Sequence, residues 1–374
     1  MRKIRKKYLL IILSIMLIIS NFSLSFAYWA SNVQGASQQG SGTVVIGSWV
    51  PTGYVGITQT GAGDYITLNE VTATGKYILM ENISNISLSP LGGTSEFTGE
   101  FYGNGFSISN ITIIGSSGNM GLFSINNGII SGVTLNNITI SNSSSSDKTV
   151  GGLAGINKQL IEKSYVTGSI TVTTAKTSSG WFSGGTATIY AGGLVGLNEG
   201  SIKYSHAAVN VTASASQTGG FLGTANAYAY AGGLVGYSTS TNAIEESYAN
   251  GNISASASRS GATFGTTTPY AGGLVGRSTG TGGIMNSFAT GNVTVNTGSN
   301  VGGLVGNSDA TVANSYRRDG QLINGTLNGG NTIGTLATES QLKSSEWMID
   351  NALWTVEIWS FDTVNYQRLK LNHY

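Results

Sequence analysis

One short string, GGL followed by Val or Ala and then Gly, recurs along the chain and limits what it can fold into. The five copies begin at intervals of 41, 40, 40 and 30 residues, at Gly151, Gly192, Gly232, Gly272 and Gly302. Each copy is followed by a serine with a ring-bearing neighbour, at Ser164-Tyr165, Ser205-His206, Ser247-Tyr248, Ser287-Phe288 and Ser315-Tyr316. A unit that recurs with this fidelity predicts an array of stacked structural repeats.

Apolar and polar residues alternate after each of the first four serines. The apolar positions are Ile170/Val172, Val211/Ala213, Ile253/Ala255 and Val293/Val295. A period of two is typical of a strand with one buried and one wet face, and such a strand cannot bury its apolar face alone. We therefore predict an all-β fold, a right-handed parallel β-helix with about one coil per repeat. Its interior would contain a stack of Leu194, Leu234, Leu274 and Leu304.

These phrases resemble the GLUG repeat of bacterial surface and secreted proteins over residues 99–325. The segment 101–113, FYGNGFSISNITI, is similar to the first coil of such proteins, and Met120-Gly121-Leu122-Phe123 is a degenerate first copy. The family includes adhesin-like proteins and some IgA-cleaving peptidases. The resemblance therefore implies an exported β-helix, while His206 and Arg317-Arg318 depart from the repeat pattern.

The N-terminus has the pattern of an export signal. Five basic residues precede an apolar stretch from Leu9 to Ser20, and Ser25 and Ala27 supply the small residues of a cleavage site. Cleavage after Ala27 would leave 13 basic and 17 acidic residues without a basic patch, which argues against nucleic acid as a partner. An uncleaved membrane anchor is the alternative, although the apolar stretch is short for a membrane-spanning helix.

The predicted cleavage site carries a second resemblance. Residues 26–30, FAYWA, followed by GTVVIG at 42–47, resemble the start of camelysin and TasA-type exported proteins of Gram-positive bacteria. Some of those proteins build extracellular fibres. This resemblance covers only the start of the chain and implies processing by a signal peptidase and a secreted, extracellular or cell-surface location.

Changes in composition suggest the boundaries along the chain. We expect a signal peptide over residues 1–27, an extended segment or linker over 28–58, N-terminal coils over 59–150, the GLUG-repeat β-helix over 151–337 and a C-terminal cap over 338–374. Glycines become rare from Thr338, and Glu339 to Asp350 is expected to be helical. Because a solenoid must cover its last core layer and block pairing at its edge, we expect the cap to close that end.

The composition offers little for an active site. The chain has no cysteine and two histidines, His206 and His373, and its 17 acidic residues are scattered. It contains neither H-E-x-x-H nor G-x-S-x-G. We therefore expect no enzyme activity, catalytic residue, cofactor or metal, and we expect His206 to replace an aromatic ring in a stack.

Three coils carry about ten extra residues relative to the last, since their intervals are 40 or 41 rather than 30 residues. Stacked coils would place the aromatic residues of these inserts above one another on one flank. Such rings can stack on sugars while polar neighbours fix the orientation. The candidate binding residues are Trp181, Phe182, Tyr190, Phe221, Tyr230, Phe264 and Tyr270. The alternative is that these rings only pack loop against loop.

The favoured function is that of an adhesin-like protein that binds polysaccharide, cell wall or a host surface glycan. The main alternative is an extracellular fibre or matrix subunit that self-associates. Outward hydroxyls such as Thr171 and Thr212 would suit lateral association, or they form an ordinary solvated strand face. A polysaccharide-degrading enzyme on the same scaffold is the least favoured hypothesis.

Overall fold

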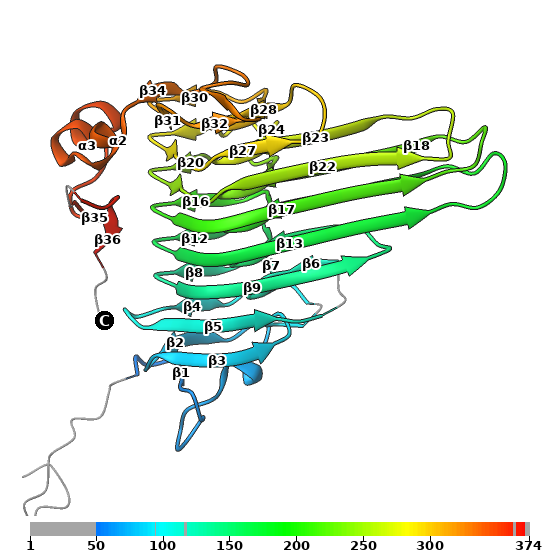
Figure 1. The fold of residues 1–374 in the computed structure, drawn as a ribbon. Helices are drawn as coiled ribbons and strands as arrows, with labels where there is room; N and C mark the ends of the chain where they lie inside the picture. Colours follow the sequence, from blue (N-terminus) through cyan, green and yellow to red (C-terminus); the bar gives the residue numbers. More distant parts are fainter. Residues whose placement is uncertain (1–49, 94, 116–117, 362–363, 371–374) are drawn as a thin grey trace, which may run out of the picture. The chain divides into compact units, whose positions relative to one another are not determined.

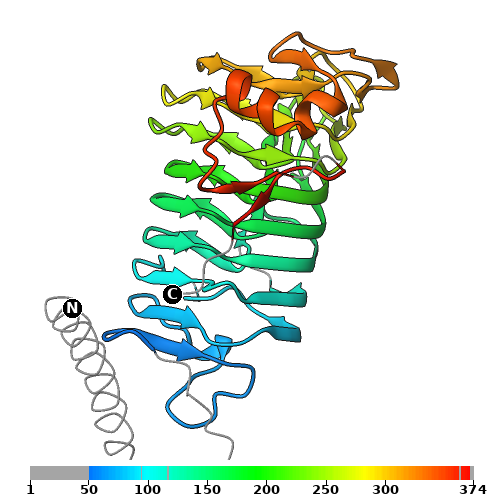
Figure 2. The same ribbon diagram turned by 90° about the vertical axis from the view of Figure 1, so that its left-hand side faces the viewer.

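A computed structural model describes residues 50–93, 95–115, 118–361 and 364–370. The predicted export signal, the TasA-like start and His373 lie outside these residues. From Val50 on, the chain winds into a column of parallel coils, which confirms the predicted β-helix (Figures 1 and 2). No helix within the described residues is long and apolar enough to cross a membrane.

Four sheets run along the column, and successive coils add strands to them; sheets C and D begin later in the chain than sheets A and B. Sheet A has nine strands, in the order β1 (Val55–Ile57), β2 (Lys76–Leu79), β4 (Glu100–Tyr102), β8 (Ile129–Ser131), β12 (Leu160–Glu162), β16 (Ser201–Lys203), β20 (Ile244–Glu245), β25 (Ile284–Met285) and β30 (Val312–Ala313). Sheet C has six, β7 (Phe123–Asn126), β11 (Ala154–Asn157), β15 (Val195–Asn198), β19 (Val235–Ser238), β24 (Val275–Ser278) and β29 (Val305–Ser308). The first paired strand, β1, begins within the segment that we expected to be extended.

Two further sheets contain the long strands. Sheet D has six strands, β6 (Asn119–Met120), β10 (Lys148–Gly151), β14 (Gly185–Gly192), β18 (Ala225–Gly232), β23 (Thr267–Gly272) and β28 (Val301–Gly302). Sheet B follows the path β3 (Ile83–Leu88), β5 (Ser107–Ile113), β9 (Thr134–Ser144), β13 (Tyr165–Thr177), β17 (His206–Thr218), β21 (Tyr248–Ala249), β26 (Phe288–Ala289), β31 (Tyr316–Arg318) and β34 (Thr335–Ala337). Its remaining strands are β22 (Ile253–Ser260), β27 (Val293–Val295), β32 (Leu322–Ile323) and β33 (Thr326–Leu327). A 3-10 turn, η1 (Leu68–Glu70), lies beside the first coils.

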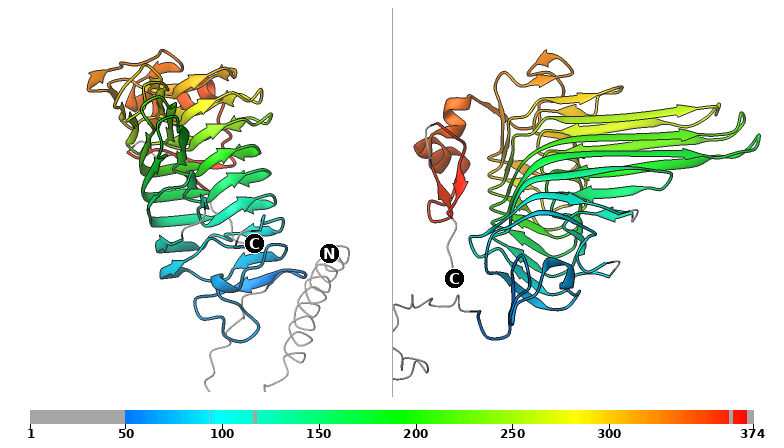
Figure 3. Two further views of the ribbon diagram at one scale, coloured as in Figure 1. Left: turned by 90° about the vertical axis from the view of Figure 1, so that its right-hand side faces the viewer. Right: turned by 60° about the horizontal axis from the view of Figure 1, so that its bottom comes forward.

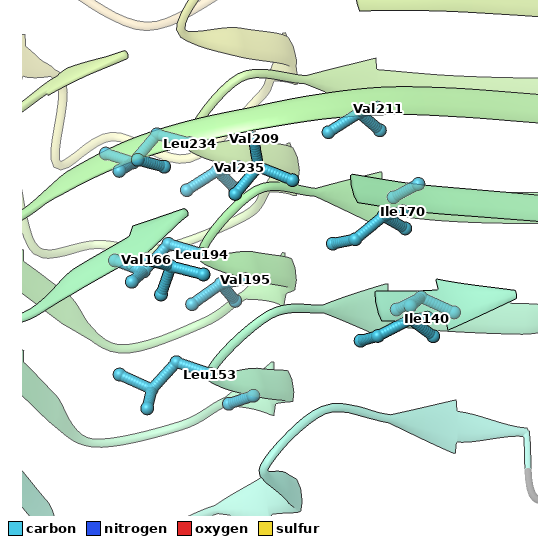
Figure 4. Close-up of a cluster of buried hydrophobic side chains, with 14 of the residues drawn as sticks. Ile140, Leu153, Val166, Ile170, Leu194, Val195, Val209, Val211, Leu234 and Val235 are labelled. Atoms are coloured by element: carbon cyan, nitrogen blue, oxygen red, sulfur yellow. The ribbon is translucent and has the colours of Figure 1, made fainter. Parts of the chain in front are cut away.

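The core is a set of apolar stacks inside the column, as Figure 4 shows. The predicted leucine stack is confirmed, since all of its members are fully buried (Leu194, Leu234, Leu274 and Leu304). The first glycine of every GGL string pairs in register with its equivalent in the next coil. A Cβ on Gly193 would lie 2.1 Å from the carbonyl oxygen of Gly233, so this corner admits only glycine.

The serine of each repeat forms a buried ladder along the column. Each backbone N–H donates to the Oγ of the serine in the next coil, at 3.1 to 3.2 Å, through Ser164, Ser205, Ser247, Ser287 and Ser315. Each Oγ in turn donates to a carbonyl two residues earlier in its own coil. A serine at this position therefore satisfies backbone groups at a corner where the strands cannot.

The inserts fold differently from the predicted loops. The outer halves of β13, β17 and β22 and of β14, β18 and β23 extend away from the column as two sheets, which we call the wing (Figures 1 and 3). Their facing side chains are buried and mostly alanine, including Ala215, Ala227 and Ala257. Short alanine side chains let the two sheets pack closely. The segments that we expected to be loops therefore form a thin, two-layered wing.

The C-terminal segment lies elsewhere than predicted. It contains α2 (Glu339–Lys343), α3 (Ser345–Ala352) and the antiparallel pair β35 (Trp359–Ser360) and β36 (Arg368–Leu369). Rather than covering the last core layer, it packs against the side of the column (Figures 1 and 2). The last coil is closed by Gln321 and Asn331, whose side chains donate to backbone carbonyls there.

Candidate functional site

The far end of the wing exposes five large apolar side chains. They lie in the three connecting loops, residues 178–184, 219–224 and 261–266, which we call the wing tips. The exposed fractions are 71% for Trp181, 78% for Phe182, 62% for Phe221, 42% for Leu222 and 57% for Phe264. The indole of Trp181 meets the ring of Phe221 edge to face with centroids 6.0 Å apart. Four of the seven predicted binding residues therefore lie together and face solvent.

Backbone hydrogen bonds tie the wing tips to one another. The N–H of Leu222 donates to the carbonyl of Trp181 at 2.7 Å, and the N–H of Thr263 donates to the carbonyl of Phe221 at 3.0 Å. A short parallel bridge also joins Thr224 and Phe264. The pairing of the sheets thus continues into the loops. The backbone that carries the exposed rings is held by hydrogen bonds between neighbouring tips.

The other three predicted residues lie at the base of the wing and pack together. Tyr190, Tyr230 and Tyr270 are in register on β14, β18 and β23. Tyr230 stacks on Tyr270 with centroids 4.7 Å apart, and Tyr237 stacks on Tyr230 at 5.1 Å. The guanidinium of Arg277 lies over the Tyr270 ring, 5.0 Å from its centroid. Burial raises the pKa of the Tyr230 and Tyr190 phenols, so these side chains stay uncharged and contribute to packing.

His206 occupies the aromatic position of its coil, as predicted. Its imidazole stacks on Tyr165 at 3.9 Å and on Tyr248 at 4.6 Å between ring centroids. Tyr248 stacks in turn on Phe288 at 4.7 Å. Burial lowers the pKa of His206 to about 3, so the side chain is neutral at physiological pH.

Several carboxylates are held by lysines of neighbouring coils. Glu100 pairs with Lys76 at 2.7 Å, and Glu245 pairs with Lys203 at 3.1 Å. Glu246 is buried instead, and its carboxylate accepts hydrogen bonds from the N–H and the hydroxyl of Thr355. Burial is the main cause that raises the pKa of Glu246. Among the described residues, no three His, Cys, Asp or Glu side chains form a group that could hold a metal ion.

Two comparisons with known proteins place the fold. The model of the GLUG motif matches residues 187–212 and 267–294, each of which runs from a wing strand through sheets C and A into sheet B. The structure is similar to a crystal structure of a "putative immunoglobulin A1 protease" from Bacteroides ovatus, with 19% identity, a TM-score of 0.50, and coverage of 81% of this chain and 88% of that chain. No curated protein sequence matches this chain.

The chain therefore contains two matches to the GLUG motif, and its fold is a parallel β-helix. At this level of identity the structural likeness concerns the fold alone and carries no activity.

Sequence reasoning did not find the region where the C-terminal segment meets the aromatic stack. Trp354 and Trp359 pack there against Phe288 and Tyr248. The available signal was the recurring ring after each serine, which forms a surface stripe that some other segment can cover.

Proposed function

We propose that the protein is an exported, adhesin-like binding protein that attaches to a glycan-bearing surface through its wing tips, without catalysis. The observation that carries the proposal is the cluster of Trp181, Phe182, Phe221, Leu222 and Phe264, each at least 42% exposed. Large apolar side chains gathered on one exposed surface mark binding sites more often than ordinary surface.

The chemistry of the wing tips favours a weakly polar target. The sequences of the three tips, SSGWFSG, GGFLGT and GATFGT, contain no charged residue. They supply aromatic faces beside small hydroxyl side chains. Indole and phenyl faces stack on the apolar faces of sugar rings, and hydroxyls can bond to the ring substituents.

The edges of the wing argue against the main alternative, in which the protein is a fibre subunit that assembles through the wing. The upper edge of the wing is formed by its last two long strands, β22 and β23. It carries Pro269 on β23, and the side chain of Asn296 bonds to both the N–H and the carbonyl of Ala257 on β22. Proline and polar caps of this kind prevent one sheet from pairing with another. Binding by the tips therefore ranks above assembly through the wing.

Co-sedimentation with a panel of insoluble polysaccharides and cell walls tests the proposal. We expect wild-type protein to be retained and a Trp181→Ala/Phe221→Ala/Phe264→Ala variant to lose at least about tenfold in affinity, equivalent to about 1.4 kcal/mol. The matched control is Leu327→Ala/Leu336→Ala/Val356→Ala, which removes three exposed apolar side chains away from the wing.

Retention of the tip variant at the wild-type level, or retention of neither protein on any material, would overturn the proposal. Concentration-dependent assembly that survives the tip substitutions would instead support the fibre subunit.

A further inference from the structure

A groove lies between the aromatic stack of sheet B and the C-terminal segment, away from the wing tips. Its volume is about 450 Å³, within the range of roughly 300–1,000 Å³ that small-ligand sites occupy. One wall comes from the column and the other from residues around β36; the lining residues are Thr134, Tyr165, His206, Tyr248, Asn250, Asn365, Tyr366, Arg368 and Leu369.

Tyr165 is the last ring of the stack on the N-terminal side. It pairs in register with His206 of the next coil and with Thr134 of the preceding coil. One face of the phenol ring is covered by the imidazole, 3.9 Å away between centroids, whereas the preceding coil offers only a threonine. The half-buried ring therefore leaves room for one more flat, apolar face to continue the stack.

Two buried polar atoms of the groove residues have no hydrogen-bond partner in the described structure. They are Nδ1 of His206, a residue only 5% exposed, and Oδ1 of Asn250. A buried polar atom without a partner is destabilising by about 1–3 kcal/mol, and these two belong to residues that line the groove, so a ligand there would supply the missing partners. Hydroxyl groups suit both, because an O–H donates to an amide oxygen and either donates to or accepts from a neutral imidazole.

The charge of the groove selects for an anion. Arg368 is the one charged residue among those that line it, and no described carboxylate lies within ion-pair distance of its guanidinium. Its positive charge acts on the phenols of Tyr165 and Tyr248, where it opposes the rise in pKa that burial causes. The hydroxyl of Tyr248 donates to the carbonyl of Gln367 at 2.7 Å, which fixes the strand that carries the arginine. A guanidinium binds a carboxylate in a planar, two-point arrangement.

We propose that this groove binds an acidic sugar of the hexuronate class, with its ring face against Tyr165, its hydroxyls toward His206 and Asn250, and its carboxylate on Arg368. This site is separate from the wing tips and does not depend on the function proposed for them. One molecule would thus carry an uncharged aromatic surface and a selective pocket for an acidic saccharide.

Isothermal titration with sodium glucuronate, its dimer and glucose tests the proposal. We expect glucuronate to bind at least about tenfold more tightly than glucose, since a charged two-point contact contributes more than about 1.4 kcal/mol. Arg368→Gln should abolish this preference, whereas Arg368→Lys should keep part of it. Tyr165→Ala should weaken both sugars. Arg259→Gln, which removes an exposed arginine near a wing tip, and the triple wing-tip variant should bind like the wild type.

Thermal unfolding of each variant separates a lost contact from a lost fold. Absence of glucuronate binding by the wild type, equal binding of glucuronate and glucose, or an unchanged preference in folded Arg368→Gln would each overturn the proposal. Sodium acetate that competes as well as glucuronate would show a plain anion site, which also overturns it. Loss of glucuronate binding in the triple wing-tip variant would contradict the separation of the two sites.

Discussion

At the scale of single residues, His206 differs from the buried serines of the column. The serines beside it are paired from coil to coil, whereas the imidazole Nδ1 has no partner in the described structure and the ring stacks between Tyr165 and Tyr248. The neutral form is therefore the one that the folded state accepts. Burial is the cause that lowers the pKa of the imidazole.

This burial predicts a specific pH dependence of stability. The folded pKa is about 3 against an ordinary 6.5, so the unfolded state binds the proton more readily between these values. The contribution is complete above pH 6.5 and is lost as the pH falls toward 3, by about 1.4 kcal/mol per pH unit in that window. His206→Phe, which installs the ring that Phe288 supplies in its own coil, should remove this part of the dependence. Urea unfolding of both proteins at pH 7.5 and pH 4 measures the difference, and equal losses would contradict the assignment.

At the scale of elements, both edges of the wing are blocked. On the upper edge, the N–H of Ala271 donates to a carbonyl of the next coil. The N–H of residue 269, two positions earlier on β23, would point the same way, but no strand of the next coil lies there, and Pro269 has no N–H to leave unpaired. On the lower edge, Asp147 accepts from the N–H of Thr188, and Lys176 donates to the carbonyl of Thr186. The coils before and after the wing both lack the insert, so these residues replace the missing strands on either side.

Removal of the upper block should make the wing self-associate. We expect a Pro269→Thr/Asn296→Ala variant to form oligomers whose size grows with concentration. The substitutions add an N–H at residue 269 on β23 and expose the N–H and the carbonyl of Ala257 on the adjacent edge strand β22. Light scattering after size-exclusion chromatography measures this, with Leu327→Ala as a control in which an exposed residue elsewhere is changed. A variant that stays as small as the wild type at all concentrations would show that the edge needs no protection.

The wing also shows which strands the sequence pattern does not predict. The coils were predictable because GGL strings and Ile/Val alternation mark corners and buried faces directly. In the inserts the same alternation continues through Ala215 and Ala227, yet alanine is a weak strand former, so the sequence pattern predicts loops there. Only pairing with the neighbouring coils makes them strands. The exposure of Trp181 follows from its place in an insert. The packing of Tyr230 depends on Tyr237, which follows in the same coil, and on Arg277 of the next coil.

At the scale of the whole described column, the C-terminal segment is attached by contacts that no local pattern encodes. The indole N–H of Trp354 donates to the carbonyl of Asn286 at 2.5 Å, and Thr355 bonds to buried Glu246 across 109 positions of sequence. A repeat array is stabilised mainly between neighbouring coils. The segment is therefore an addition to the column, and it forms one wall of the groove.

Weakening this attachment should release the segment while the coils stay folded. Trp354→Ala removes a side chain that is 2% exposed, and truncations of buried tryptophan lower stability by about 3–5 kcal/mol. We expect residues 338–370 to lose protection from hydrogen exchange while the serine ladder keeps its own, because the ladder's bonds lie within the column. Trp181→Ala, which removes an exposed tryptophan at a wing tip, is the matched control and should leave both regions protected. The same release should abolish glucuronate binding and leave retention on insoluble polysaccharide unchanged. Loss of protection throughout the column would show instead that the segment is part of one cooperative unit with the coils.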